Sequence, residues 1–192
     1  MTYQDVLDFW FGAPGSIEAG KPRRAWFVKK DDFDATIRTR FGTTIELALA
    51  GGLRDWDAAG PQGVLARILV LDQFTRNAHR NTPQSFAGDA LALAAARALV
   101  DAGADRGLPP LQRAFVYMPF EHAEDATMQE RAVELFGVLA AEHPGFDEML
   151  DYAHRHRGVI ARFGRFPHRN DILGRASTPD EVEFLRQPGS RF

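Results

Sequence analysis

Near the C-terminal end of the chain, the stretch FGRFPHRN brings together four side chains that commonly bind anions. They are Arg165, His168, Arg169 and Asn170. Gly164 is expected to end the preceding helix, and Pro167 to keep it from resuming, so these side chains should lie on a loop. Planar guanidiniums beside an imidazole and an amide suit recognition of a phosphate or a carboxylate. The alternative is that arginines at a helix C-terminus cap free carbonyl groups.

A second polar group lies in LDQFTRN, within a predicted helix that begins at Pro61. Helical spacing places Asp72 on the same face as apolar Leu65 and Ile68, with Arg76 one turn further on. Because a buried carboxylate without a partner is very unfavourable, Asp72 should pair with Arg76, with His156 or with an arginine of the C-terminal stretch. Asn77 belongs to the same polar helix end. An ordinary structural ion pair is the alternative interpretation.

A third candidate is His156, the polar member of an otherwise apolar helical stripe that also contains Met149, Ala153, Ile160 and Phe163. A buried imidazole needs a hydrogen-bond partner, since leaving it without one costs roughly 1–3 kcal/mol. His156 is therefore either a satisfied core histidine or a functional one.

The stretch YMPFEHAED contributes His122 and Glu124. Pro119 should end or kink the helix at Met118 and expose Glu121 and its neighbours around a turn. A metal site formed by His122, Glu124 and His156 is conceivable, but the spacing of EHAE is weak, and we expect no metal and no cofactor.

Opposite charges accumulate in adjoining parts of the chain. Residues 120–151 hold nine acids and one base, a local charge of −8, whereas residues 154–175 hold six arginines and one acid, a local charge of +5. These segments should face each other, so that part of the arginine is neutralised within the fold. The rest of the acidic run is expected on an exposed helix face.

Helical periodicity and capping signals account for the elements that must position these residues. Thr2 with Asp5, and Thr178 with Glu181, have the form of capping boxes. We found no segment with the alternation typical of a strand. Short connections predict antiparallel helical hairpins, and the fold class is all-α with about eight helices. The predicted helices begin near residues 2, 32, 61, 89, 108, 125, 146 and 178.

Length and composition limit the class of protein. The 192 residues fit one domain, or two tightly joined halves, and the 45% apolar content is that of a globular protein. The absence of cysteine, of a secretion signal and of a membrane helix favours a cytoplasmic protein. A net charge of −3 without a reading motif argues against nucleic acid. No lysine-rich amphipathic helix supports a membrane partner.

Together, LDQFTRN, YMPFEHAED and HRGVIARFGRFPHRNDILGRASTPDEVEFL resemble the bacterial family catalogued as domain of unknown function 924, along nearly the whole chain. The resemblance implies a tetratricopeptide-like (TPR-like) right-handed α–α superhelix, and it implies no activity. Ala123 stands where serine is common in that family. The polar positions that the resemblance marks are Asp72, Gln73, Arg76, Asn77, His122, Glu124, His156, Arg165, His168, Arg169 and Asn170.

Three functions remain open from the sequence. The first is a binding module whose polar pocket holds an anionic small molecule or an acidic peptide, with Arg76, Asn77, His122, Glu124, Arg165, Arg169 and Asn170 as ligand-binding residues. The second is a hydrolase for phosphoester or acyl substrates, in which Asp72 orients His156 or His168 as a general base. The third is an interaction scaffold whose polar cluster is structural. The oligomeric state stays open.

Overall fold

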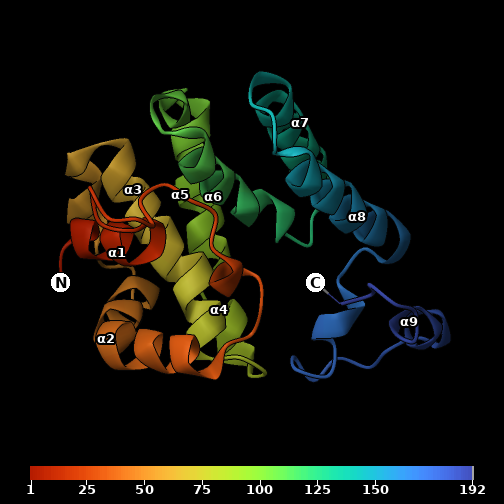
Figure 1. Cartoon of the computed structure of the whole chain (residues 1–192). Coiled ribbons are helices and arrows are strands. Elements are labelled where there is room, and N and C mark those ends of the chain that lie inside the picture. The colour runs from red at the N-terminus through yellow and green to blue at the C-terminus, as the bar shows by residue number, and fades with distance from the viewer. Residues whose placement is uncertain (192) are drawn as a thin grey trace. The chain divides into compact units, whose positions relative to one another are not determined.

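The structure is a computed structural model that describes residues 1–191, and within them it contains α-helices and no β-strand. The all-α prediction is confirmed (Figure 1). Nine α-helices are formed by these residues, together with short 3-10 turns and one π-helical segment, Val70–Phe74. The α-helices are α1 Tyr3–Phe11, α2 Asp31–Leu49, α3 Pro61–Leu69, α4 Thr75–Ala78, α5 Asp89–Asp101, α6 Pro110–Glu121, α7 Ala126–Glu142, α8 Asp147–Phe163 and α9 Pro179–Leu185.

Local capping explains where several helices begin and end. The Thr2 hydroxyl accepts from the Asp5 N–H and the Asp5 carboxylate accepts from the Thr2 N–H, which completes the predicted capping box of α1. Gly164 ends α8 with φ of 69°, a left-handed conformation that glycine adopts without strain. Both boundaries were predicted from the sequence.

The predicted helix break at Pro119 is wrong. α6 continues through Pro119 to Glu121. Pro119 lies in the last turn of the helix, so the missing proline N–H removes a hydrogen bond only near the end, where little helix remains to be disrupted. As a consequence Glu121 is helical and buried, with 5% of its surface exposed, instead of lying on an exposed turn.

The chain divides into two compact units, which are described separately. Unit 1 comprises Met1–Arg80 and Gln84–Pro119, and unit 2 comprises Asn81–Pro83 and Phe120–Phe192. None of the helices formed by residues 1–191 is both long and apolar enough to cross a membrane.

The core of unit 1 is rich in aromatic side chains. α3 packs against α1 and α5, and α2 packs against α4. Trp10 contacts Phe74 and Phe115, with ring centroids 5.4 and 5.7 Å apart, and Phe74 also contacts Phe41 at 4.7 Å. Aromatic pairs at these separations add to the stabilisation that burial provides.

A continuous helix in unit 1 contains α3, the π-helical segment Val70–Phe74 and α4. In the π-helical turn the Thr75 N–H donates to the Val70 carbonyl oxygen five residues earlier, and the Thr75 hydroxyl donates to the same oxygen at 2.9 Å. Such turns are rare and occur frequently at functional sites. This one contains Asp72 and Gln73, two of the polar positions identified in the sequence.

Unit 2 is built on a helical hairpin. α7 packs against α8, and residues 143–146 connect them. After α8 the chain forms a short 3-10 turn at Pro167–Arg169 and an irregular segment, and then begins α9. The short 3-10 turn packs against α9, so the stretch FGRFPHRN is held between two helices of the same unit.

Candidate functional site

The C-terminal arginines and the acids of unit 2 form an ion-pair cluster, here defined as Glu124, Arg165, Asn170, Arg175 and Glu181. Glu124 accepts from Arg175 through both carboxylate oxygens, at 2.6 and 2.9 Å, and from the Phe166 N–H at 2.7 Å. Burial opposes ionisation of Glu124, but these hydrogen bonds outweigh it, and the pKa of the carboxyl is lowered. The predicted pairing between the acidic and the basic segments is confirmed.

Glu181 organises the other half of the ion-pair cluster. It accepts two hydrogen bonds from Arg165, at 2.7 and 2.8 Å, and one each from the Thr178 N–H and the Asn170 amide. The Arg165 hydrogen bonds are the main cause that lowers the pKa of Glu181 to about 2. The sequence identified Glu181 only as part of a capping box, which is also formed.

Arg169 and Asn170 are buried in contacts within unit 2. The Arg169 guanidinium lies over the Phe166 ring at 4.5 Å and donates to the His122 carbonyl oxygen at 3.0 Å. Asn170 donates to the Ser177 hydroxyl and accepts from Arg175 Nε. The anion-binding side chains predicted for this loop therefore contact groups of the protein itself.

The expected buried imidazole has a carboxylate neighbour that the sequence did not reveal. His156 Nδ1 lies 2.8 Å from Glu121 Oε1 and 2.9 Å from the Tyr152 carbonyl oxygen. Both neighbours act as acceptors, so we place the imidazole proton on Nδ1. His156 is 6% exposed, as its place on the apolar stripe predicted.

A buried glutamine fixes the turn that carries these acids. Gln129 of α7 donates from Nε2 to the carbonyl oxygens of Glu121 and Ala123, at 2.6 and 2.8 Å. Free carbonyl groups at the end of α6 are thereby satisfied. Sequence reasoning missed Gln129, although its position on the buried face of a predicted helix was a usable signal.

His168 is held in its neutral form. Burial, followed by the positive charge of Arg169, lowers the pKa of His168 to about 3. Its ring lies 5.7 Å from that of Phe166. At neutral pH the loop therefore presents one imidazole without charge.

In unit 1, Asp72 pairs with Arg76, which was one of the partners predicted for it. Asp72 Oδ1 lies 2.9 Å from Arg76 Nη1, and the Gln73 amide donates to Asp72 Oδ2. Arg76 also binds Asp89 through two hydrogen bonds, at 2.7 and 3.1 Å. Burial alone would lower the pKa of Arg76, but the Asp72 and Asp89 carboxylates raise it by more. The net shift of the pKa is upward, so the guanidinium stays charged.

Asn77, in α4, contributes to a separate polar contact in unit 1. It donates to Asp34 Oδ1 at 2.7 Å, and Arg80 contacts the same carboxylate through Nε at 2.5 Å. Asp34 is 3% exposed, so this pairing compensates a buried charge between α2 and the end of α4. The sequence did not single out Asp34.

The structure thus divides the predicted site residues between the two units. Asp72, Arg76 and Asn77 lie in unit 1, and the other candidates lie in unit 2: His122, Glu124, His156, Arg165, His168, Arg169 and Asn170. Among residues 1–191 no group of three histidine or acidic side chains is arranged to hold a metal ion. The metal variant with His122, Glu124 and His156 therefore gains no support.

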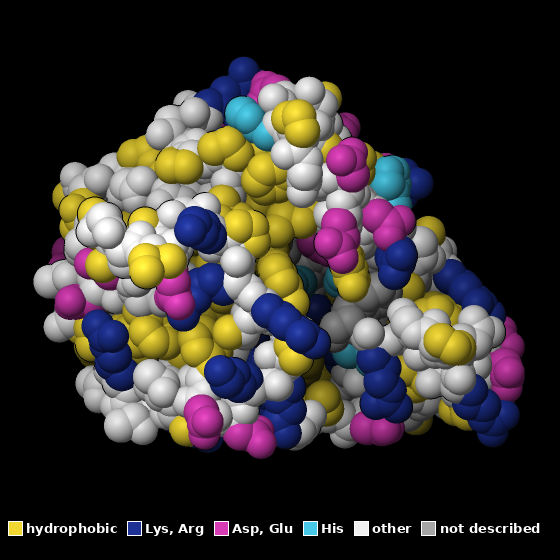
Figure 2. Space-filling view, viewed as in Figure 1, with side chains coloured by type: hydrophobic (Ala, Val, Ile, Leu, Met, Phe, Trp, Pro, Cys, Tyr) yellow, Lys and Arg dark blue, Asp and Glu magenta, His cyan; other side chains and the backbone are white. Residues whose placement is uncertain are grey.

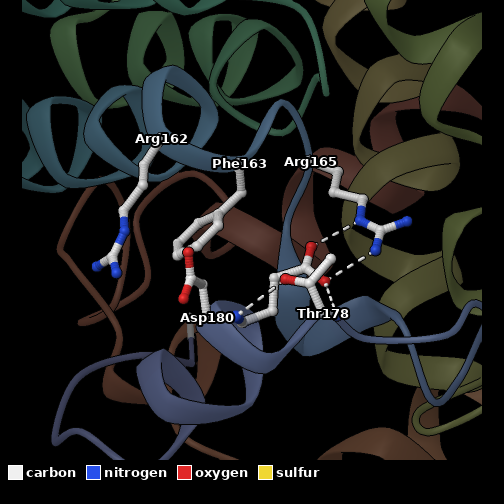
Figure 3. Close-up of a pocket in the computed structure, with 6 residues that line it drawn as sticks. Arg162, Phe163, Arg165, Thr178 and Asp180 are labelled. Atoms are coloured by element: carbon white, nitrogen blue, oxygen red, sulfur yellow. Dashed lines mark hydrogen bonds and ion pairs between the residues drawn. The ribbon is translucent and has the colours of Figure 1, made fainter.

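A hollow of about 410 Å³ opens beside the ion-pair cluster in unit 2. Arg162 and Phe163 reach it from the C-terminal end of α8, and Thr178 and Asp180 from the start of α9 (Figure 3). Its lining is completed by Arg165 and Glu181. The Arg162 guanidinium lies 4.6 Å from the centre of the Phe163 ring and 5.9 Å from that of Phe184.

The comparisons with known proteins identify a family and a structural relative. A family model described as "Bacterial protein of unknown function (DUF924)" matches residues 6–189. A solved structure of a protein of unknown function from Agrobacterium tumefaciens, ATU0120, is similar to this chain, with 37% sequence identity and a TM-score of 0.81 over 95% of this chain and 96% of that chain. No curated protein matches.

Proposed function

The chain belongs to the DUF924 family, and because that family's description names no activity, we propose from the geometry of unit 2 that the protein is a binding module for a small anionic molecule or an acidic peptide end. The ligand is held in the hollow by Arg162, and the ion-pair cluster beside it is structural. The α7–α8 hairpin supports the TPR-like arrangement that the resemblance implies.

The contrast between Arg162 and its neighbours carries the proposal. Among residues 154–175, Arg155, Arg157, Arg165 and Arg175 each pair with a carboxylate, and Arg169 donates to a carbonyl oxygen. Within the described residues the side chain of Arg162 makes no hydrogen bond and has no carboxylate partner, and it lines the hollow. A guanidinium that packs on aromatic rings but donates no hydrogen bond within the protein keeps its donors for a carboxylate or a phosphate.

The other groups of the hollow define what kind of anion fits. Phe163 offers apolar ring surface next to the Arg162 guanidinium, so a ligand with an apolar or planar part gains contact area. Asp180 is exposed in the same hollow and accepts a hydrogen bond from a ligand hydroxyl or amine. Arg165 adds positive charge but is already bound to Glu181.

Calorimetric titration and thermal shift with phosphates, nucleotides and carboxylates test this assignment. A ligand that fits should raise the melting temperature of the wild type, and Arg162→Gln should weaken its binding roughly tenfold. Arg186→Gln is the matched control, since Arg186 is an exposed arginine directly after α9 that pairs with Glu183 outside the hollow. If no anion binds, or if both variants bind as the wild type does, the proposal is rejected.

The Glu121–His156 pair favours hydrolysis as a second candidate function. A carboxylate that accepts from Nδ1 orients the imidazole and leaves Nε2 as the basic atom, which is the arrangement of a general base. Glu121 would then have the orienting role first considered for Asp72. An esterase and phosphatase screen in which His156→Gln retains all activity would exclude it.

A further inference from the structure

A second surface, in unit 1, combines exposed apolar side chains with lysines. The lysine loop, defined as residues 17–30 between α1 and α2, contains all three lysines of a chain that has twenty arginines. It also contains the most exposed large apolar side chains of the described residues, Ile17 at 87% and Phe27 at 59%, with Val28 at 45%. In Figure 1 this loop is the red-orange segment that joins α1 to α2 in unit 1.

The lysine loop is anchored to the core next to its exposed apolar residues. Trp26 is 5% exposed, its Nε1 donates to the Trp10 carbonyl oxygen at 3.2 Å, and its ring stacks on that of Trp10 at 5.7 Å. Arg23 adds hydrogen bonds to the carbonyl oxygens of Phe9 and Trp10. Because Trp26 is fixed, the Phe27–Val28 pair that follows it is held out in solvent.

The charges of the lysine loop are only partly neutralised within unit 1. Arg23 pairs with Glu18 at 3.3 Å, and Lys29 pairs with Asp31 at 3.2 Å. The three other cations of the loop, Lys21, Arg24 and Lys30, are exposed and form no ion pair with any residue of 1–191. One exposed acid, Asp32, follows the loop. Even with this negative charge counted, the three unpaired cations leave a net positive charge beside the exposed apolar side chains. On the face drawn in Figure 2, basic and hydrophobic side chains lie next to each other.

The presence of lysine instead of arginine in this loop favours one class of partner, anionic lipid, over another, a protein surface. Interfaces between proteins are enriched in arginine and depleted in lysine, because a guanidinium binds carboxylates with fixed two-bond geometry. Lysine is a strongly hydrated point charge, which is sufficient for attraction to anionic lipid headgroups and imposes no bonding geometry. A chain that uses arginine almost everywhere else places its lysines here, next to an exposed phenylalanine.

We propose that the lysine loop docks unit 1 onto an anionic lipid surface. Phe27 and Val28 insert into the boundary between headgroups and acyl chains, and Lys21, Arg24 and Lys30 lie at the level of the lipid phosphates. The sequence argued against a membrane partner because no basic amphipathic helix is present. In the structure, a loop instead of a helix carries the exposed basic and apolar side chains that membrane binding requires. This proposal is independent of the hollow in unit 2.

The test is co-sedimentation of the full chain with vesicles of neutral phosphatidylcholine, with or without about 30% phosphatidylglycerol. We expect binding to the anionic vesicles only, and weakening as salt rises. Lys21→Ala with Lys30→Ala should lower the partition coefficient about 25-fold, since each basic residue contributes about fivefold. Phe27→Ser with Val28→Ser should abolish binding.

Leu47→Ser is the matched control, because Leu47 is a 53% exposed apolar residue of α2 in the same unit, outside the lysine loop. It should bind as the wild type does. The melting temperature of each variant shows whether it is folded, and the lysine variants alter only exposed side chains. Failure of the wild type to bind anionic vesicles at low salt, equal binding to neutral ones, or full binding by the Phe27 and Val28 variant would overturn the proposal.

Discussion

Arg165 and Glu181 form a two-bond ion pair, with Nε–Oε1 at 2.7 Å and Nη2–Oε2 at 2.8 Å, that joins the segment after α8 to the first turn of α9. The same carboxylate caps α9 through the Thr178 N–H. Glu181 thereby adds a polar link between two elements that also meet through the 3-10 turn at Pro167–Arg169 and the Phe163–Phe184 ring contact.

Replacing Glu181 tests the structural role of the ion-pair cluster. Glu181→Gln should lower the free energy of unfolding by about 1–3 kcal/mol, because the amide cannot accept from both Arg165 nitrogens and also cap α9. Glu183→Gln, two positions further along α9, removes an exposed charge and should change stability by less than about 0.5 kcal/mol. Urea denaturation of both variants gives the comparison. Equal stability of the two would show that the ion-pair cluster does not support the fold.

His168 and Glu181 both make the free energy of unfolding depend on pH in the acid range. The folded-state pKa of His168, about 3, is below its ordinary value of 6.5, so below pH 6.5 the unfolded chain binds a proton that the folded chain does not. Stability should therefore fall as pH decreases from 6.5 towards 3, by up to about 1.4 kcal/mol per unit. Denaturation curves at several pH values measure this slope, and His168→Asn should reduce it. An unchanged slope in that variant would contradict the assignment.

Glu181 acts at lower pH. Its folded-state pKa, about 2, is below the ordinary 4.5, so its contribution is complete above pH 4.5 and is lost as pH falls towards 2. The loss should be absent in Glu181→Gln. Acid unfolding followed by circular dichroism compares the two proteins, and coincident curves below pH 4.5 would contradict the prediction.

A double-mutant cycle on Glu121 and His156 measures their contact. Either Glu121→Ala or His156→Ala should cost roughly 1–3 kcal/mol, because each leaves a buried polar partner behind. The double variant should lose less than the sum of the two single losses, with an interaction energy in the range of about 0.5–3 kcal/mol. Chemical denaturation supplies the four values. Additive losses would mean that the two side chains are energetically independent.

Two glycines of unit 1 should respond oppositely to alanine. A Cβ atom at Gly88 would lie 2.1 Å from the Leu71 carbonyl oxygen, so Gly88→Ala must shift backbone and should cost about 1–3 kcal/mol. Gly42, inside α2, has open space at that position, and Gly42→Ala should stabilise by about 0.5–1 kcal/mol. Thermal unfolding distinguishes the two, and a stabilised Gly88→Ala would show that the close approach is not maintained.

The parts of the structure that depend on local sequence were predictable. Capping at Thr2 and Thr178, the end of α8 at Gly164 and the burial of His156 follow from spacing along one helix. The pairing of Asp72 with Arg76 follows in the same way, because the two residues lie one helical turn apart.

The sequence predicted that the acidic and basic segments face each other, but not which individual side chains from different elements meet. Glu121 is buried because α6 continues past Pro119, which the proline signal argued against. The carboxylates that occupy Arg165 and Arg175 come from segments 16 and 51 residues away in sequence. Arg162 cannot be distinguished from its neighbouring arginines in the sequence. That no carboxylate of the described residues pairs with it becomes clear only from the positions of the acids in the structure.

The π-helical turn at Val70–Phe74 sets the angular phase of the residues beyond it. An α-helix rotates by about 100° per residue, and a wider turn accommodates an extra residue without disturbing the helix on either side. If the same sequence formed an uninterrupted α-helix instead, Arg76 and Asn77 would be turned by about 100° away from Asp89 and Asp34. The wide turn is therefore needed for both contacts, in addition to the side chains that make them.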